Sequence, residues 1–231
     1  MFGGSVQALS GEKSVADRIA EFGDAVRARL IGRFRQIGLN YPAKKMVLVG
    51  LKQERLLEVW VGDGSSIRFL KTYPILGASG TLGPKLREGD RQVPEGIYKI
   101  ESLNPNSRFH LALRVGYPND FDKEKAHRDG RTNLGSDIMI HGGTASVGCL
   151  AVGDKPAEDL FVLAAQTGIE NVELILAPVD FRVAEIIRFR HSLAPGCNTR
   201  ITSRLPFPLS LPSFPWLPFP PILCLRQQLR R

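Results

Sequence analysis

The residues best suited to chemistry are a histidine and a cysteine on either side of a glycine-rich bend, His141 and Cys149. The run Asp137–His141 is short and mostly apolar, as in a buried strand, and Gly142-Gly143 predicts a turn after it. If the chain doubles back there, the thiol comes within reach of an imidazole that can take its proton, as a cysteine nucleophile requires. Glycine also lets backbone N–H groups approach a substrate and hold a developing oxyanion. The segment therefore predicts acyl transfer.

Each of the two residues also has a purely structural interpretation. Cys149 could be a small buried hydrophobic residue, and His141 a strand histidine with satisfied hydrogen bonds. A metal site would need residues at characteristic ligand spacings, which His110, His127, His141 and Cys149 lack. The run Gly80–Lys85 resembles a phosphate loop but has neither the Gly-Lys-Ser/Thr ending nor a helix pattern after it. We therefore expect no metal and no cofactor.

The residues around the pair resemble the L,D-transpeptidase catalytic domain, the YkuD-type fold of bacterial cell-wall enzymes. Its signature is a His-Gly pair followed by Ser-x-Gly-Cys, here His141-Gly142 and Ser146-Val147-Gly148-Cys149. The gap between the two halves is shorter than in most of the family, and Ala151 replaces the arginine usually found two places after the cysteine. Both features are similar to the YafK-like branch.

Upstream motifs are similar to the same branch, and the resemblance extends from about Tyr41 to Arg182. These motifs are Gly83-Pro84-Lys85, Arg87-Glu88-Gly89-Asp90 and Val93-Pro94-Glu95-Gly96. The resemblance implies a mainly β fold with a few flanking helices, built as an antiparallel β catalytic domain. It also implies a murein substrate in the periplasm or cell envelope.

The resemblance further implies a mechanism. Cys149 attacks a carbonyl of a peptidoglycan stem peptide, such as that of the diaminopimelate to D-alanine bond, and forms a thioester. His141 is the base, while Gly142, Ser146 and Gly148 belong to the oxyanion site or its loop. The thioester then passes to an amine of a second stem peptide or of a wall-linked lipoprotein. A backbone carbonyl, of Gly142 or Gly143, is expected to orient the histidine, although Asp137 and Asp154 are nearby carboxylates.

His110 and Arg131 are the candidates for substrate binding. In the predicted strand Phe109–Val115, His110 and Arg114 lie opposite the apolar face, which leaves them toward solvent or toward a substrate cleft. Arg131 ends a predicted charged loop over residues 122–132, where the YafK-like branch has similar sequence. Its planar guanidinium suits a substrate carboxylate.

Composition limits the other functional classes. The formal net charge is +8, but five arginines follow Pro195 with no acidic residue, and without them 26 basic residues face 23 acidic ones. Nucleic-acid binding then has no basic patch beyond four arginines between Arg27 and Arg35, which we interpret as the solvated face of a helix. Three cysteines form neither a disulfide framework nor a CxxC pair.

The spacing of apolar residues predicts the elements that position the site. A three-to-four residue repeat from Ser14 to Ile37 predicts an amphipathic helix capped by Ser14. Strands are expected at 45–51, 55–61, 67–73, 97–103, 109–115 and 171–177. The glycine- and proline-containing segment 77–96 predicts a loop, and a helix is expected from about Asp154 to Gly168.

The chain divides into three predicted parts: an N-terminal helical extension (1–40), the catalytic domain (41–182) and a C-terminal extension (183–231). The run from Leu205 to Leu225 is uncharged over 21 positions, but seven of them are proline, which excludes a transmembrane helix. We expect disorder from residue 195. The first ten residues lack the basic start and apolar core of a secretory signal, so membrane contact is expected only through a signal or anchor outside this sequence.

Three functions remain open at this level. The first is a transpeptidase that forms cross-links or attaches a protein to the wall. The second is a hydrolytic L,D-endopeptidase or carboxypeptidase, favoured by the short gap and by Ala151, which could open the acceptor side. The third is a wall-binding module without catalysis.

Overall fold

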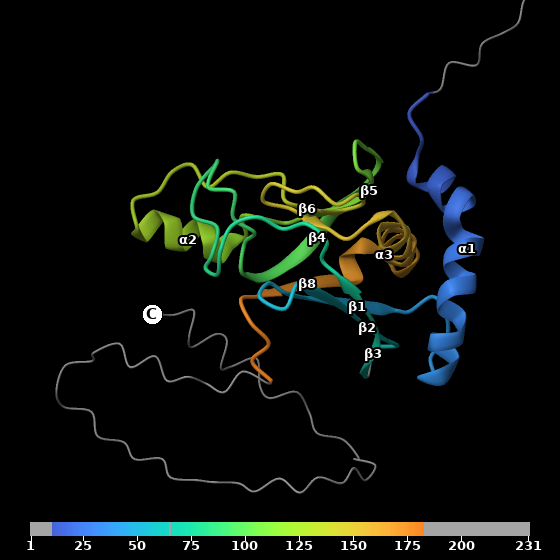
Figure 1. Cartoon of the computed structure of the whole chain (residues 1–231). Helices are drawn as coiled ribbons and strands as arrows, with labels where there is room; N and C mark the ends of the chain where they lie inside the picture. The colour runs from blue at the N-terminus through green and yellow to red at the C-terminus, as the bar shows by residue number, and fades with distance from the viewer. Residues whose placement is uncertain (1–10, 65, 183–231) are drawn as a thin grey trace, which may run out of the picture. The chain divides into compact units, whose positions relative to one another are not determined.

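The computed structural model describes residues 11–64 and 66–182, and within them the chain forms an eight-stranded sheet and three α-helices (Figure 1). The strands are β1 (Lys45–Leu51), β2 (Leu56–Gly62), β3 (Ile67–Pro74), β4 (Gly96–Ser107), β5 (His110–Val115), β6 (Met139–His141), β7 (Leu150–Ala151) and β8 (Val172–Ala177). The helices are α1 (Val15–Gln36), α2 (Asp120–Arg128) and α3 (Asp154–Thr167), with a 3-10 turn, η1 (Ile169–Asn171). The predicted C-terminal extension, 183–231, lies outside the described residues.

The strand order is β3-β2-β1-β8-β4-β5-β6-β7. The consecutive strands β1 and β2, β2 and β3, and β4 and β5 pair antiparallel. Two pairs are parallel, β1 with β8 and β6 with β7. The first of these arises because α3 carries the chain from β7 at the sheet edge back to the middle before β8 begins. The mainly β fold with flanking helices is confirmed, and the sheet is mixed rather than wholly antiparallel.

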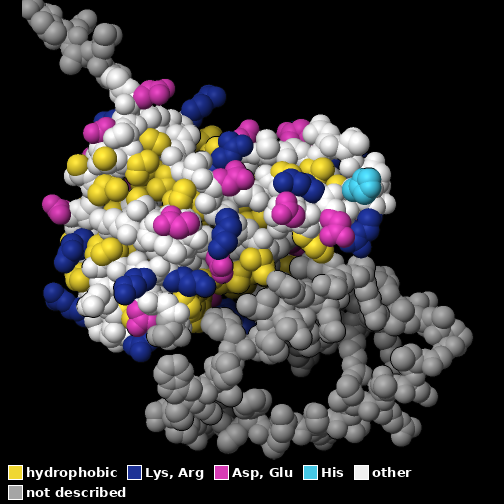
Figure 2. All heavy atoms as spheres, turned by 180° about the vertical axis from the view of Figure 1, so that it is seen from behind, with side chains coloured by type: hydrophobic (Ala, Val, Ile, Leu, Met, Phe, Trp, Pro, Cys, Tyr) yellow, Lys and Arg dark blue, Asp and Glu magenta, His cyan; other side chains and the backbone are white. Residues whose placement is uncertain are grey.

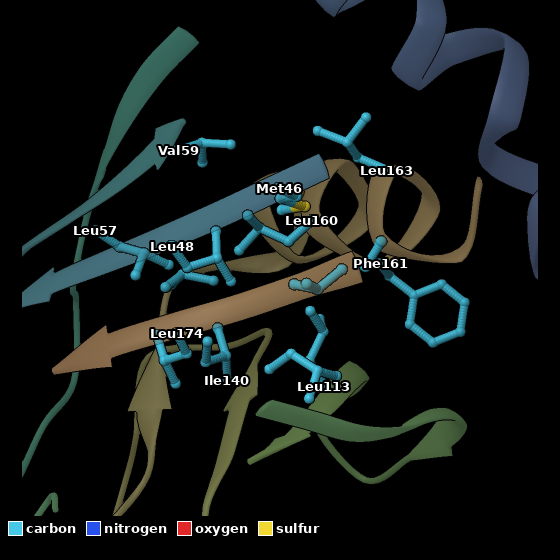
Figure 3. Packing of buried hydrophobic residues seen from close by; sticks show 14 of the residues in the cluster. Met46, Leu48, Leu57, Val59, Leu113, Ile140, Leu160, Phe161, Leu163 and Leu174 are labelled. Carbon is cyan, nitrogen blue, oxygen red and sulfur yellow. The ribbon is translucent and has the colours of Figure 1, made fainter. Parts of the chain in front are cut away.

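The core lies between α3 and the sheet. Leu160, Phe161 and Leu163 of α3 are at most 1% exposed and belong to one apolar cluster with β1, β2, β5, β6 and β8 (Figure 3). Burial of such side chains stabilises the fold by roughly 1.5–3 kcal/mol each. This packing holds β6 and the edge strand β7 against the rest of the sheet, and these two strands flank the His141–Cys149 segment.

The predicted N-terminal helix is confirmed as α1. Ser14 Oγ accepts the N–H of Asp17 at 3.1 Å, and the Asp17 carboxylate accepts the N–H of Ser14 at 2.8 Å, which completes a capping box. The apolar stripe of α1 ends up buried, with Val26, Leu30 and Phe34 at most 1% exposed. The helix therefore packs into the same core as the sheet.

One prediction about local structure was wrong. The segment expected to be a charged loop over 122–132 begins with the helix α2. Asn119 caps it by accepting the N–H of Asp122 at 2.9 Å, and acidic residues in its first turn with basic ones in its last turn suit the helix dipole. Ala126 is its one buried residue, so the sequence shows no apolar repeat that could reveal the helix.

The expected alternation along β5 also needs correction. Phe109 lies in the turn before the strand and is 48% exposed, whereas Leu111, Ala112 and Leu113 are all fully buried. Both faces of β5 are covered at its centre, because α3 packs on this strand. In the part of the chain that the structure describes, no helix is both long and apolar enough to cross a membrane.

Candidate active site

The parallel pairing of β6 and β7 positions the histidine and the cysteine. Ile140 lies opposite Leu150, and His141 lies opposite Ala151. Residues two apart along a strand point to the same face. Cys149 comes immediately before β7 and two residues before Ala151, so by this register it continues the face on which His141 lies. The chain doubles back after the glycines, and the two side chains come from adjacent segments on one face.

The histidine is buried and held in one orientation. His141 is 2% exposed, and its Nδ1 lies 2.6 Å from the carbonyl oxygen of Gly142. Because a carbonyl oxygen only accepts hydrogen bonds, Nδ1 carries a hydrogen, and in the neutral ring Nε2 is the nitrogen with the lone pair. The expectation that a backbone carbonyl orients the ring is confirmed by this contact.

The two nearby carboxylates have other partners. Asp137 Oδ1 lies 2.8 Å from a guanidinium nitrogen of Arg114, and Asp154 Oδ1 accepts the N–H of Gly143 at 2.8 Å. The bend needs glycine at position 142, since a Cβ there would lie 2.6 Å from Asp154 Oδ1 and 2.7 Å from the carbonyl oxygen of Phe109. The start of α3 thereby fixes the turn that follows the histidine.

Two serine hydroxyls fix the loop that carries the cysteine. Ser146 Oγ donates to the carbonyl oxygen of Cys149 at 2.7 Å and accepts the N–H of the same residue at 3.1 Å. The N–H of Gly148, a residue with φ of 83°, donates to Ser79 Oγ at 2.7 Å. Ser146 therefore shapes this loop, as the resemblance implies. Ser79, which belongs to the loop 77–96, was not predicted.

The surroundings of Cys149 favour the protonated thiol. Its Sγ donates a hydrogen bond to the carbonyl oxygen of Asp137 at 3.5 Å. Burial raises the pKa of the thiol, and the Asp137 carboxylate adds to this, against the lowering effects of a hydrogen bond from the Met139 backbone and of the Lys85 charge. A thiol with a raised pKa needs a base to become a nucleophile, and the lone pair on His141 Nε2 suits that task.

An aromatic side chain covers the histidine. The ring of Phe109 stacks on that of His141, with ring centroids 4.6 Å apart and an interplanar angle of 29°. Phe109 comes from the turn between β4 and β5, 32 positions earlier in the sequence. The alternation of the sequence had placed this residue inside the core, so its contact with the histidine was not predicted.

The two candidates for substrate binding have partners of their own. His110 Nε2 lies 3.2 Å from a carboxylate oxygen of Glu158, and its ring meets the edge of Phe22 with centroids 5.3 Å apart. Arg131 donates to Asp129 and, at 2.9 Å, to the carbonyl oxygen of Leu86. His110 thus contacts α1 and α3, whereas Arg131 connects the end of α2 to the loop 77–96. Their proposed role toward a substrate stays a prediction.

Two features of the described residues bear on metal binding and on nucleic-acid binding. Among the described residues, no group of three or more His, Cys, Asp or Glu side chains is arranged to hold a metal ion. On the face shown in Figure 2, basic and acidic side chains are interspersed rather than gathered into one basic patch.

The fold and the paired His-Gly and Ser-x-Gly-Cys segments define a β-sheet enzyme domain of the L,D-transpeptidase class. The family described as the YkuD L,D-transpeptidase catalytic domain matches residues 44–173, more than half of the chain, and this chain belongs to that family.

Comparison with known proteins gives relatives of the same kind. The chain is 33% identical over 146 residues to a protein of Escherichia coli K12 named "Putative L,D-transpeptidase YafK", a match that covers 61% of this chain and 57% of that protein. The chain thus spans little more than half the length of this relative.

Two solved structures also match. The helical cell shape determining protein Pgp2 of Campylobacter jejuni is 25% identical, with a TM-score of 0.48 and coverage of 59% of this chain and 48% of that one. Bd1075 of Bdellovibrio bacteriovorus is likewise 25% identical, with a TM-score of 0.43 and coverage of 58% and 48%.

Proposed function

We propose that this protein is a cysteine-dependent L,D-transpeptidase that acts on peptidoglycan stem peptides through a thioester on Cys149. The observation that carries the proposal is the orientation of His141: its Nδ1 is bound to the Gly142 carbonyl oxygen, so Nε2 keeps its lone pair on the face where Cys149 lies. This arrangement supports general-base activation of a partly buried thiol. Family membership supports the substrate class.

The proposed reaction has two halves. In the first, the thiol proton passes to His141 Nε2, and Sγ of Cys149 attacks the carbonyl carbon of the bond between diaminopimelate and D-alanine. Backbone N–H groups near Gly148 and Cys149 stabilise the oxyanion. The C–N bond breaks, the departing D-alanine amine takes the proton from His141, and a thioester remains. In the second half, an amine attacks the thioester, loses a proton to His141 and restores the thiol.

The acceptor decides which reaction the protein performs. An amine of a second stem peptide gives a cross-link, an amine of a lipoprotein attaches that protein to the wall, and water gives hydrolysis. These substrates place the proposed activity in the periplasm or cell envelope. Ala151 is fully buried and bridged to Gly77, so this position does not favour an acceptor side that is open to water.

Intact-mass spectrometry with a carbapenem tests the acylation half. The wild-type chain should gain one covalent adduct, Cys149→Ala should gain none, and His141→Ala should react far more slowly. Cys197→Ala is the matched control, because it removes another thiol and should keep the adduct. An adduct that survives Cys149→Ala, or a wild type that forms none, would contradict the proposal.

Incubation with tetrapeptide muropeptides tests the second half. Cross-linked dimers support transpeptidation, whereas tripeptide monomers with free D-alanine would establish the hydrolase instead. Binding to sacculi that is unaffected by Cys149→Ala, without any acyl adduct on the wild type, would establish a binding module.

A further inference from the structure

The loop 77–96 runs beside the segment that carries the cysteine. Gly77 forms an antiparallel bridge with Ala151, in which the N–H of Ala151 donates to the Gly77 carbonyl oxygen at 2.8 Å and the N–H of Gly77 donates back at 3.2 Å. The approach is close, since a Cβ on Gly77 would lie 2.1 Å from the carbonyl oxygen of Thr144. If the same register is continued by two residues, Ser79 comes opposite Cys149.

The Ser79 hydroxyl connects the two segments by two short hydrogen bonds. It accepts the N–H of Gly148 at 2.7 Å and donates to the carbonyl oxygen of Arg91, also at 2.7 Å. Gly148 has φ of 83° and is buried, so its peptide group has no regular strand or helix to hold it. Ser79 anchors the peptide group before Gly148, while Ser146 anchors the next residue, Cys149, from the other side.

The anchor itself is rigid. Within the loop 77–96, the Asp90 carboxylate accepts Lys85 Nζ at 2.7 Å and the N–H groups of Leu86, Arg87 and Gln92. Although partial burial raises the pKa of Asp90, these hydrogen bonds, Lys85 first, lower it to about 2. The loop that carries Ser79 is thus tied together around a carboxylate that stays ionised at neutral pH.

A second buried ion pair holds the same loop to the sheet. Lys52 Nζ, next to the end of β1, donates to the carbonyl oxygens of Gly83 and Val93 and to the Glu95 carboxylate, all within 2.9 Å. Buried, hydrogen-bonded ion pairs of this kind tolerate little displacement, because a separated partner is left charged and desolvated. Ser79 therefore reaches Gly148 from a fixed position.

We propose that Ser79 is a positioning residue for the acylation step, an inference that rests on the proposed function. Its hydroxyl holds the peptide between Val147 and Gly148, and so fixes the direction of the Cys149 N–H beside it. The Cys149 N–H donates to Ser146 Oγ at 3.1 Å, a longer contact than the 2.7 Å between the Gly148 N–H and Ser79 Oγ. The Cys149 N–H is therefore the donor that turns to the oxyanion when Sγ attacks. Without the Ser79 hydroxyl, the peptide at Gly148 can rotate, and the Cys149 N–H then no longer points in a fixed direction.

The test compares two reactions of the same thiol. Carbapenem acylation passes through an oxyanion, whereas alkylation by iodoacetamide does not. Ser79→Ala should slow acylation about tenfold, less than the loss of a direct oxyanion donor, because the donor itself remains. Alkylation of Cys149, followed by peptide mapping, should stay within about twofold, since the base and the thiol are untouched.

Two variants serve as controls. Ser79→Thr keeps the hydroxyl and should recover most of the acylation rate. Thr81→Ala removes another hydroxyl of the same loop, one that bonds to Gln92 and Leu82 rather than to the cysteine segment, and should leave both reactions unchanged.

Each other outcome overturns the role of Ser79. Equal acylation by Ser79→Ala and wild type would show that the hydroxyl is dispensable. Faster acylation would show that it blocks the Gly148 N–H, and a parallel loss in both reactions would show general damage to the loop. A wild type that forms no adduct would instead remove the proposed function, and this inference with it.

Discussion

Two histidines of this domain lie beside a phenylalanine, and their surroundings differ in one respect that decides their chemistry. His110, at the start of β5, meets Phe22 of α1 and directs Nε2 to the Glu158 carboxylate. His141, at the end of β6, stacks on Phe109 and directs Nδ1 to the carbonyl oxygen of Gly142. Nε2 of His110 is thus engaged with the Glu158 carboxylate, whereas the contact of His141 with Gly142 uses Nδ1 and leaves Nε2 available.

The hydrogen-bond partner of each histidine distinguishes the two regions better than the exposure of its side chain does. His141 is 2% exposed, yet its free lone pair lies on the face of the cysteine, while the side chain of His110 is 26% exposed and tied to the helices. A carbonyl partner selects one tautomer without supplying charge. We therefore propose that the region around His141 carries the chemistry and that His110 attaches α1 and α3, while a role of His110 toward a substrate stays a prediction.

Exchange of each histidine for alanine should give the largest contrast. His141→Ala removes the base, and carbapenem acylation of Cys149 should fall by roughly 10²–10⁴-fold. His110→Ala should leave the acylation rate within a few-fold of wild type while it lowers the melting temperature. Intact-mass time courses and thermal unfolding measure the two effects. A comparable loss of acylation in both variants would erase the distinction between the two regions.

The ion pairs next to His110 should matter for stability and not for acylation. Asp159 is 3% exposed and accepts hydrogen bonds from Arg29 at 2.7 Å and Tyr73 at 2.6 Å. Asp159→Ala removes the buried acceptor shared by Arg29 and Tyr73, leaves Arg29 with Glu158 alone, and should lower the free energy of unfolding by about 3 kcal/mol. Urea denaturation measures this change.

The matched control for Asp159 is Glu21→Ala. Glu21 also forms ion pairs with basic residues, Lys13 and Arg18, but on the surface, and its loss should leave the denaturation midpoint unchanged. The folded fraction of Asp159→Ala should acylate at the wild-type rate. A slow folded fraction would place Asp159 among the residues that support the chemistry.

The thiol should reveal its raised pKa once the base is removed. In His141→Ala, alkylation of Cys149 depends on its thiolate fraction, which falls about tenfold for each pH unit below the pKa. Because burial raises that pKa, the rate should continue to rise with pH after an exposed cysteine has levelled off. Peptide mapping separates Cys149 from Cys197 and Cys224. A profile that levels off earlier than that of free cysteine would contradict this environment.

Exchange of the phenylalanine beside each histidine for alanine should give the smallest difference between the two regions. Phe109 is 48% exposed, so Phe109→Ala should cost little stability, but loss of the stacked ring should slow acylation by about two- to tenfold. Phe22→Ala should destabilise the attachment of α1 and leave the rate constant unchanged. Measured rates and melting temperatures that respond in the same way in both variants would argue against a role for Phe109 in holding His141.

Much of the fold could be predicted because its signals are local. The cap and the apolar repeat of α1 and the short apolar runs of the early strands depend on neighbours within one turn or one strand, and these elements lie where they were expected. Helix α2 was missed because a short helix with a single buried residue leaves no repeat. Pairing of β8 with β1 joins segments more than 120 positions apart, which no local pattern specifies.

The sequence by itself determined the His-Gly and Ser-x-Gly-Cys segments and, with the upstream motifs, the family. Each of these motifs consists of residues close together in the sequence, whereas the Gly142 carbonyl as the partner of His141 was only an expectation until the structure showed it. Only the tertiary structure decided that Ser79 holds Gly148, that Phe109 covers His141 and that Arg29 pairs with Asp159. Such contacts arise when distant segments are packed against one sheet, and their residue types suit many other partners equally well. The chemistry of the site can be read locally, whereas the precision of its geometry comes from packing.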